Sequence, residues 1–408
     1  MILCYFVKMK KNILFINHSV RDGGPGRSLF YLLKHFDYNK YNVHVLIPSK
    51  NTFSENIKNE NLNINEIISK NFPENLKKQN FNILGKSISI FPLDILINFI
   101  RLIILSITLK NLIKKNKIEL IYCNGTQAKV FGSIVGFIYN IKTIWHVRNI
   151  QTNFFFKWLI NTCGKFKNVK KIICVSNATS EQFRLRSKNI VINNGIDTDE
   201  FSNNKIIKNL RNEYKIEKNK IILGTAGRIV PRKGFEYFIE VCKEISHVYK
   251  KDCVFAIVGD TPFYFKQNLM KKLKDKVDEY NLTNKFIFTG YKKDVESYIA
   301  DFDIFFIPSR YPDPFPRVVI ESMALSKPII GFKIGGIGEA IDNGINGYSH
   351  KINENPTKNI VSLIENENLR LNMGFNSRKK SVNQYDSRII ANKILLVLES
   401  LFSSGSKA

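Results

Sequence analysis

The chain has 408 residues, of which 44% are hydrophobic, which is enough to form the cores of two or three domains. Its 62 Lys and Arg residues outnumber 35 Asp and Glu residues, and the net charge of +27 favours an anionic partner. Six scattered cysteines without a C-x-x-C pair argue against a disulfide framework and indicate reduced thiols of a cytoplasmic protein.

The two ends of the chain carry little structural signal. Residues 1–7 are apolar but too short and too poorly framed for a signal peptide. Met9, which is followed by two lysines and an apolar run, is a more typical start than Met1. Residues 403–408 are expected to be disordered.

Short apolar runs alternate with amphipathic segments along the whole chain. The predicted strands are 13–17, 43–48, 118–123, 143–147, 171–176, 221–226, 253–259, 286–290, 304–308 and 328–332. Most of these runs are continuously apolar, which is typical of parallel strands buried on both faces. Amphipathic segments such as 235–249 and 318–325 separate them, so the sequence predicts a doubly wound α/β architecture.

A polar, glycine-containing stretch at 193–201 interrupts this alternation, and a new series of strands begins near residue 221. We therefore expect two α/β domains of similar size, residues 1–197 and 198–385.

The longest apolar segment is 91–109. Because Asp94 and Arg101 interrupt it, we expect a poor transmembrane span. Its polar residues fall at helical spacing, so a well-buried helix is the favoured interpretation. The alternative is a helix docked on a bilayer surface, with the lysines at 110, 114, 115 and 117 meeting lipid headgroups.

The first candidate site follows the first predicted strand, where Gly24 and Gly26 precede an apolar helix. Such glycines would let the backbone approach a ligand, and the helix N-terminus would present N–H groups to phosphate. The spacing matches neither G-x-G-x-x-G nor a P-loop, so a plain strand-to-helix turn is the alternative.

His146 lies at the end of the fourth predicted strand, which is where open α/β sheets bind ligands. It could hydrogen-bond a sugar hydroxyl or assist proton transfer from an acceptor. A structural histidine is the alternative.

Two cations follow the strand predicted at 221–226. Arg228 and Lys233 stand between Gly227 and Gly234, and they suit a diphosphate whose charge increases as a sugar–phosphate bond breaks. A solvated basic turn is the alternative.

Two carboxylates follow the strand predicted at 304–308. Glu321 is expected to begin a helix, close to the backbone amides of the loop from Phe315 to Val318. It could accept hydrogen bonds from two ribose hydroxyls, and Asp313 from a hydroxyl of a transferred sugar. The alternative is a helix-dipole acid and a turn residue.

Two further patterns carry weaker predictions. The segment 335–339, with Gly335 and Gly336, could bring N–H groups to a phosphate or form a simple tight turn. Asp301 and Asp303 have the spacing of a metal-binding D-x-D but are better explained as a helix-to-strand junction. The cysteines and histidines lack metal-ligand spacing, so no metal site is predicted.

These residues, in this order, resemble the retaining family 4 (group 1) glycosyltransferases of the GT-B fold. The resemblance covers nearly the whole chain and rests on the glycines at 23–26, His146, residues 175–177, 194–197 with Phe201, 227–228, 233–234, 258–260, 288–291, 308–309, Asp313, Glu321 and 335–336. The family pattern has a glutamate where this chain has Asp313, which is one methylene shorter.

The resemblance implies two Rossmann-like domains that face each other across a cleft. Residues 1–197 would bind the acceptor and 198–385 the nucleotide sugar, with a C-terminal helix at about 386–402 packing back on the first domain. Arg228 and Lys233 would bind the diphosphate and Glu321 the ribose. Asp313, with loop amides of Phe315, Arg317 and Val318, would contact the sugar. His146 would lie near the reaction centre, and Gly24 and Gly26 near the donor.

The resemblance further implies a retaining, metal-independent reaction that needs no cofactor. The acceptor would be a glycan or a lipid-linked glycan, and the protein would work in the cytoplasm at an anionic membrane surface, without nucleic acid. Two alternatives remain. One is a GT-B nucleotide-sugar epimerase, and the other is a non-catalytic basic protein that binds membranes or nucleic acid.

Overall fold

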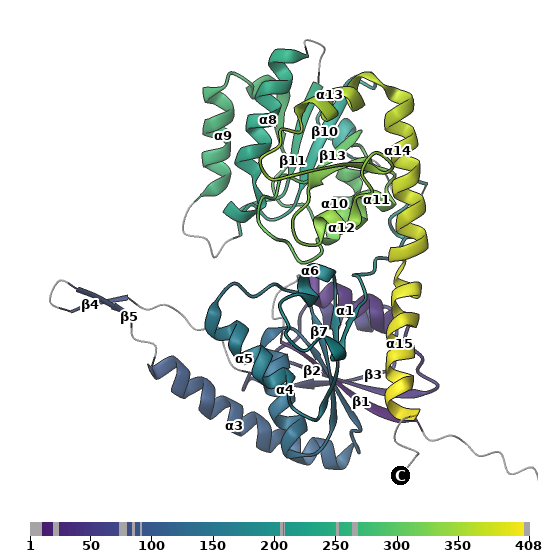
Figure 1. Cartoon of the computed structure of the whole chain (residues 1–408). Helices are drawn as coiled ribbons and strands as arrows, with labels where there is room; N and C mark the ends of the chain where they lie inside the picture. Colours follow the sequence, from purple (N-terminus) through teal and green to yellow (C-terminus); the bar gives the residue numbers. More distant parts are fainter. Residues whose placement is uncertain are drawn as a thin grey trace, which may run out of the picture. The chain divides into compact units, whose positions relative to one another are not determined.

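The computed structural model describes residues 10–18, 24–72, 80–83, 86–89, 92–204, 207, 209–249, 253–262 and 268–403. The expectations for Met1, Met9, Gly23 and residues 404–408 lie outside this range. The chain divides into two compact units (Figure 1). Unit 1 comprises Met1–Cys174, Ser180–Ile192 and Ala391–Ala408, and unit 2 comprises Val175–Thr179 and Asn193–Ile390.

Unit 1 contains a seven-stranded, fully parallel sheet. Its order is β3 (Ile64–Ile68), β2 (Tyr41–Ile47), β1 (Lys11–Asn17), β6 (Leu120–Asn124), β7 (Lys142–Val147), β8 (Val169–Cys174) and β9 (Asn189–Val191). The helices are α1 (Gly24–Lys34), α2 (Thr52–Asn59), α3 (Pro92–Lys115), α4 (Thr126–Ile138) and α5 (Phe154–Gly164), with a 3₁₀ turn at Arg186–Lys188. An antiparallel pair, β4 (Asn80–Ile83) and β5 (Lys86–Ser89), precedes α3.

Unit 2 contains a six-stranded, fully parallel sheet. Its order is β12 (Phe286–Phe288), β11 (Cys253–Val258), β10 (Ile221–Ala226), β13 (Ile304–Phe306), β14 (Ile329–Phe332) and β15 (Gly347–His350). Its longer helices are α8 (Phe235–Val248), α9 (Leu269–Glu279), α11 (Arg317–Ala324), α13 (Thr357–Glu365) and α14 (Glu367–Lys380). Short helices are α6 (Asn177–Ser180), α7 (Leu210–Glu213), α10 (Val295–Ile299) and α12 (Ile337–Ala340), with 3₁₀ turns at Pro231–Lys233 and Thr283–Lys285 and a π turn at Ser381–Tyr385.

The predicted α/β class with two parallel sheets is confirmed, and all ten predicted strands form. Successive residues of a strand enter opposite cores, as shown by Ile222 and Leu223 of β10, which belong to different apolar clusters. The prediction missed β3, β9 and β15 and the antiparallel pair of β4 and β5. The first three are edge strands, and edge strands need less apolar sequence because only one neighbour pairs with them.

The last helix, α15 (Ser387–Ser403), passes from unit 2 into unit 1. Lys142 Nζ donates to Leu401 O at 2.5 Å, and the ring of Phe402 lies 6.0 Å from that of Tyr41. The division between the units falls at 192/193, slightly before the expected 197/198. Asn194 and Gly195 belong to unit 2 because they hydrogen-bond to the loop at Phe315 and to Arg317.

The strand order of each sheet reverses once, and this fixes where ligands are expected. In unit 1, β2 and β3 lie on one side of β1, and β6 to β9 lie on its other side. In unit 2, β11 and β12 lie on one side of β10, and β13 to β15 lie on its other side. Loops that leave such neighbouring strands in opposite directions open a crevice at their carboxyl ends.

The expectation that residues 91–109 form a well-buried helix is wrong. The helix α3 forms, but most of its large apolar side chains between 96 and 107 are exposed, including Phe99 and Ile107. By length and composition alone, residues 96–115 would suffice to cross a membrane. Only 17% of the apolar window of this helix is buried.

Candidate functional site

The main candidate site lies in unit 2, at the carboxyl ends of β10 and β13. The turn after β10 carries Arg228 and Lys233, and the loop after β13 carries Asp313. These strands are hydrogen-bonded neighbours at the point where the strand order reverses. Residues far apart in sequence are therefore brought to the same end of the sheet by the strand order.

The turn after β10 depends on Gly234. Its φ of 75° is left-handed, and an added Cβ would lie 2.2 Å from Pro308 O. The same turn is held by Ser309 Oγ, which donates to Arg232 O at 3.0 Å. This close approach fixes the cationic turn against the end of β13 and so places Lys233 beside the loop with Asp313.

Lys233 and Asp313 form an ion pair through Nζ and Oδ2, and both side chains are partly buried, with 19% exposed. The sequence predicted both residues for one ligand but not their contact with each other. The pair keeps each charge compensated in the ligand-free protein. A diphosphate that binds Lys233 would compete with the Asp313 carboxylate.

The turn at Gly335 and Gly336 packs on the backbone of the same loop. Gly336 N donates to Asp313 O at 2.7 Å. Gly335 has a φ of 55°, and a Cβ at this position would lie 2.2 Å from Asp313 O. The predicted glycine turn therefore positions Asp313 through the hydrogen bond from the Gly336 amide to the Asp313 carbonyl oxygen.

Glu321 does not begin a helix, and this part of the prediction is wrong. The helix α11 begins at Arg317, so Glu321 occupies its fifth position and is only 4% exposed. Its Oε1 lies 3.0 Å from Arg317 Nη2, although the pair lacks the alignment of a good hydrogen bond. A buried carboxylate oxygen without an aligned donor among the described residues is costly to the fold, and such groups are typical of binding sites.

The amides expected from Phe315, Arg317 and Val318 surround the start of α11. Asn194 Nδ2 donates to Phe315 O at 2.8 Å, and Arg317 Nη1 donates to Gly195 O at 2.9 Å. The Arg317 side chain is thus directed to the protein backbone and Glu321, and its contribution to a ligand would come from its amide. The first amides of a helix have no partner within the helix, which suits an anionic or hydroxyl ligand.

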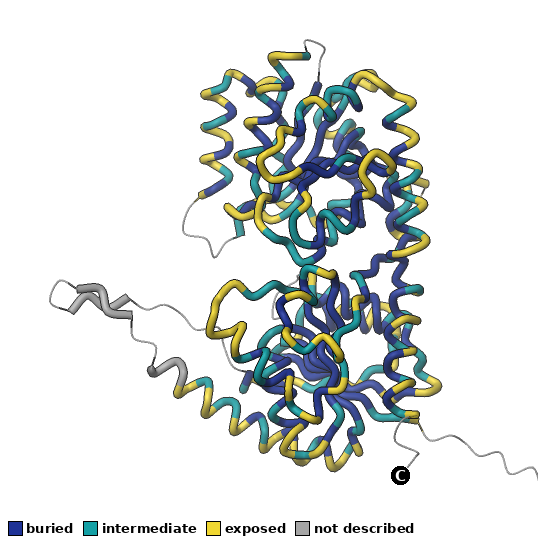
Figure 2. The backbone as a smooth tube through the Cα atoms, viewed as in Figure 1, coloured by how far each residue is buried: buried dark blue, intermediate teal, exposed yellow. Residues whose placement is uncertain are grey.

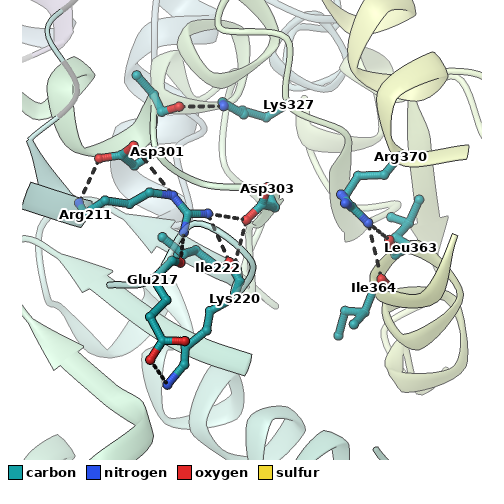
Figure 3. A network of polar contacts seen from close by, with 11 residues as sticks. Arg211, Glu217, Lys220, Ile222, Asp301, Asp303, Lys327, Leu363, Ile364 and Arg370 are labelled. Carbon is teal, nitrogen blue, oxygen red and sulfur yellow. Dashed lines mark hydrogen bonds and ion pairs between the residues drawn. The ribbon is translucent and has the colours of Figure 1, made fainter. Parts of the chain in front are cut away.

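Asp301 and Asp303 form a structural junction, as favoured from the sequence. Asp301 Oδ2 accepts from Arg211 N at 2.9 Å, and Asp303 Oδ2 accepts from Arg211 Nη2 at 2.9 Å and Ile222 N at 2.8 Å (Figure 3). They precede the amino end of β13, whereas Asp313 follows its carboxyl end. Within the described residues, no group of three His, Cys, Asp or Glu side chains could hold a metal ion.

In unit 1, His146 lies in β7 and is 1% exposed. Burial, reinforced by the nearby charge of Arg148, holds its pKa well below the usual 6.5. Its Nδ1 lies 3.1 Å from Arg148 Nη2 and 2.6 Å from Tyr122 Oη. Because a guanidinium only donates, Nδ1 accepts and the ring proton resides on Nε2. The buried Nε2 has no hydrogen-bond partner among the described residues, which suits donation to a ligand oxygen.

Gly24 and Gly26 lie in the first turn of α1, after β1. Gly26 is buried, yet an added Cβ would meet no atom within 4 Å among the described residues. The carbonyl of Pro25 accepts from Asn124 Nδ2 at 3.0 Å, and Arg148 Nε donates to Asn124 Oδ1 at 2.8 Å. The glycine turn and His146 therefore belong to one polar network at the carboxyl ends of β1, β6 and β7.

Sequence reasoning missed several residues that hold these groups. Asn194 and Gly195 support the loop before α11, and Tyr122, Asn124 and Arg148 surround His146. Tyr122 and Asn124 lie in β6 itself, and the sequence named Asn194 and Gly195 only as part of the family resemblance. Glu339, within the segment named at 335–339, accepts from Asn177 N at 2.9 Å and Ala178 N at 3.0 Å and so ties Val175–Thr179 to unit 2.

Two Rossmann-like units, one of which carries two cations and two carboxylates in the loops and helix near its switch point, are typical of a glycosyltransferase of the GT-B fold. The family models agree. Glycosyltransferase family 4 matches residues 22–200, and the group 1 glycosyl transferases match residues 206–380. The chain belongs to this family of glycosyltransferases.

Individual relatives support the assignment. The chain is 31% identical over 290 residues to the uncharacterized glycosyltransferase MJ1178 of Methanocaldococcus jannaschii, covering 67% of this chain and 73% of the relative. It is 23% identical over 301 residues to the Escherichia coli UDP-Gal:α-D-GlcNAc-diphosphoundecaprenol α-1,3-galactosyltransferase, covering 69% and 75%. The crystal structure of Anabaena HepE in complex with UDP and glucose has the same fold, with a TM-score of 0.75, 22% identity and coverage of 96% and 100%.

Proposed function

We propose that this protein is a retaining, metal-independent glycosyltransferase that moves a sugar from a nucleoside-diphosphate sugar to a hydroxyl of a glycan or lipid-linked glycan. The reaction would serve cell-surface polysaccharide synthesis. The observation that carries the proposal is the ion pair of Lys233 with Asp313 at the switch point of unit 2, with the buried Glu321 in the helix that follows the same loop.

Each group has a chemical role in this proposal. Arg228 and Lys233 bind the diphosphate and stabilise its charge as it leaves. Glu321 accepts hydrogen bonds from the two ribose hydroxyls, which would provide the aligned donors that its Oε1 lacks among the described residues. Asp313 and the amides of Phe315, Arg317 and Val318 bind the transferred sugar.

The transfer step requires no protein nucleophile. The acceptor oxygen attacks the anomeric carbon from the face that the diphosphate leaves, and the bond between that carbon and the phosphate oxygen breaks. The acceptor proton passes to an oxygen of the departing diphosphate, so the products are a glycoside and a nucleoside diphosphate. His146, neutral with its proton on Nε2, donates a hydrogen bond to a ligand oxygen rather than acting as the base.

Two observations support a lipid-linked acceptor and a cytoplasmic location. The E. coli relative is described as acting on a diphosphoundecaprenol-linked sugar. The five described cysteines are unpaired and buried, as expected in a reducing compartment.

The first test is calorimetric titration of the purified protein with UDP, GDP and ADP in the presence of EDTA, alongside the Glu321→Gln variant. We expect one nucleotide to bind selectively. The variant should bind it about 10–100-fold more weakly, because a neutral amide is a poorer acceptor for ribose hydroxyls than a buried carboxylate. Glu240→Gln, which removes an exposed acid paired with Lys276, is the matched control and should bind like the wild type.

The outcomes separate the candidate functions. Binding to no nucleotide by folded protein would refute the transferase and favour a non-catalytic basic protein. Binding followed by release of a rearranged sugar without an acceptor would establish the epimerase. NMR of the glycoside product tests the stereochemistry, since retention gives the anomeric configuration of the donor. Turnover that EDTA abolishes would contradict the proposed metal independence.

A further inference from the structure

The helix α3 of unit 1 has one face in the protein and the opposite face in solvent. Leu105, Leu109 and Ile113 are buried in the unit 1 core, and their spacing of four residues aligns them along one side. The exposed apolar residues of this helix are Leu96, Ile97, Phe99, Ile100, Ile103, Ile104 and Ile107. Figure 2 shows the exposed and half-buried residues along most of α3.

The exposed apolar residues share one helical face. At 3.6 residues per turn, they fall within an arc of about 160°, which lies opposite the buried side. Phe99 and Ile107 are 57% and 60% exposed. Monomeric proteins rarely leave so many large apolar side chains contiguous in water, so this face is expected to have a partner.

Lysines continue the same face toward the C-terminal end of the helix. Lys110, Lys114 and Lys115 are exposed, and at helical spacing they fall on the exposed side. An apolar stretch followed by cations on one face matches a partner that is apolar inside and anionic at its surface. A lipid bilayer with acidic headgroups has these two properties.

A second helix adds aromatic side chains. Phe154, Phe155 and Trp158 of α5 are 84%, 59% and 55% exposed. The buried residues of α3, α4 and α5 belong to one apolar cluster, so the three helices cover the same face of the sheet (Figure 1). Aromatic rings are enriched where protein meets the headgroup region of membranes.

We propose that this docking surface, formed by the exposed face of α3 with Lys110, Lys114 and Lys115 and by Phe154, Phe155 and Trp158 of α5, binds in the plane of an anionic membrane. The apolar side chains enter the boundary between headgroups and acyl chains, and the lysines contact acidic headgroups. This interaction is independent of sugar transfer and goes beyond the proposed function.

Two other arrangements fit the surface less well. Spanning the bilayer would pull Leu105, Leu109 and Ile113 out of the core of unit 1, where they are buried. A second copy docked symmetrically on α3 would bring three lysines from each chain to the interface, and residues 96–115 contain no acidic side chain that could pair with them.

The test is cosedimentation of the full chain with vesicles of phosphatidylcholine alone or mixed equally with phosphatidylglycerol. Wild type should bind the mixed vesicles more tightly, and high salt should weaken binding. Ile103→Glu with Ile107→Glu should reduce the partition coefficient at least about tenfold, because two apolar contacts become charged. Replacing Lys110, Lys114 and Lys115 with Gln should reduce binding to the anionic vesicles by about fivefold per lysine.

The matched control is Leu371→Glu with Phe375→Glu, which changes two exposed apolar residues of α14 in unit 2 and should leave vesicle binding unchanged. Circular dichroism confirms that each variant is folded. Equal vesicle binding by wild type and the α3 variants would overturn the proposal. So would resistance of membrane-bound protein to alkaline carbonate, which indicates a span, or lipid-independent dimers that the Ile103 and Ile107 changes abolish.

Discussion

At the residue scale, Lys233 and Asp313 form an ion pair in the candidate site. Each side chain neutralises the other in a partly buried position. In the proposed function, a diphosphate replaces the carboxylate at Lys233, and Asp313 is released to accept a sugar hydroxyl. Donor binding and sugar recognition would then be linked through one contact.

This linkage predicts opposite effects of Asp313→Asn on binding and on turnover. A nucleoside diphosphate should bind about 3–10-fold more tightly, since Lys233 no longer has a competing carboxylate and one negative charge is removed. Sugar transfer should fall about 100-fold or more because the sugar loses a charged acceptor. Calorimetry and initial rates measure the two quantities.

Asp313→Glu is the corresponding control, because it keeps the charge and restores the family residue. It should retain measurable transfer and leave diphosphate affinity within a few-fold of wild type. Weaker diphosphate binding in Asp313→Asn would show that the ion pair supports the phosphate site instead of competing with it.

At the scale of elements, the site depends on turns that bring separate loops together. The turn at Gly335 and Gly336 packs on the backbone of Asp313 and Pro314. Asn194 and Gly195 hold the other end of the same loop through Phe315 and Arg317. Two segments distant in sequence thus fix one ligand-binding loop.

We predict that Gly335→Ala lowers both stability and transfer. A Cβ on Gly335 would lie 2.2 Å from Asp313 O, in addition to the strain of a φ of 55°. The expected loss of unfolding free energy is about 2–4 kcal/mol, and the displaced loop should reduce transfer more than tenfold.

The Gly344→Ala variant distinguishes the cost of backbone strain from the cost of a steric clash. Gly344 has a φ of 80°, but a Cβ there meets no atom within 4 Å among the described residues, so we expect a cost of about 1 kcal/mol and unchanged transfer. Denaturant unfolding and initial rates check both variants. Equal effects of the two substitutions would show that contact with the Asp313 loop is unimportant.

At the scale of the whole molecule, buried histidines couple stability to pH. Burial lowers the pKa of His18 to about 4, and it holds the pKa of His146 well below 6.5. Both residues belong to unit 1. The unfolded chain takes up protons near pH 6.5 while the folded chain does not, so their stabilising contribution is present above that pH and is lost as the pH falls toward 4.

Between pH 7 and pH 5 the two histidines together should cost unit 1 roughly 3 kcal/mol, which corresponds to a fall in Tm of about 5–10 °C. His146→Gln should reduce this fall by at most about half, since His18 still titrates and burial also lowers the pKa of His44 in the same unit. Differential scanning fluorimetry at the two pH values measures it. A pH-independent Tm, or the same fall in the variant, would contradict the prediction.

The sequence by itself determined the α/β class, the ten principal strands and the residues that follow them. These features are local, because apolar runs specify strands, and glycines, cations and acids mark the turns after them. The motifs of Arg228, Lys233, Asp313 and Glu321 also indicated the family.

Only the tertiary structure decided which of these groups touch. The pairing of Lys233 with Asp313 follows from β10 lying beside β13, and strand order is a non-local property that no turn encodes. The buried position of Glu321 depends on where α11 begins, and a helix boundary depends on capping and on packing against neighbouring segments. The exposure of α3 could not be predicted from the sequence either, because an apolar helix has the same sequence pattern whether it packs in a core or faces a membrane.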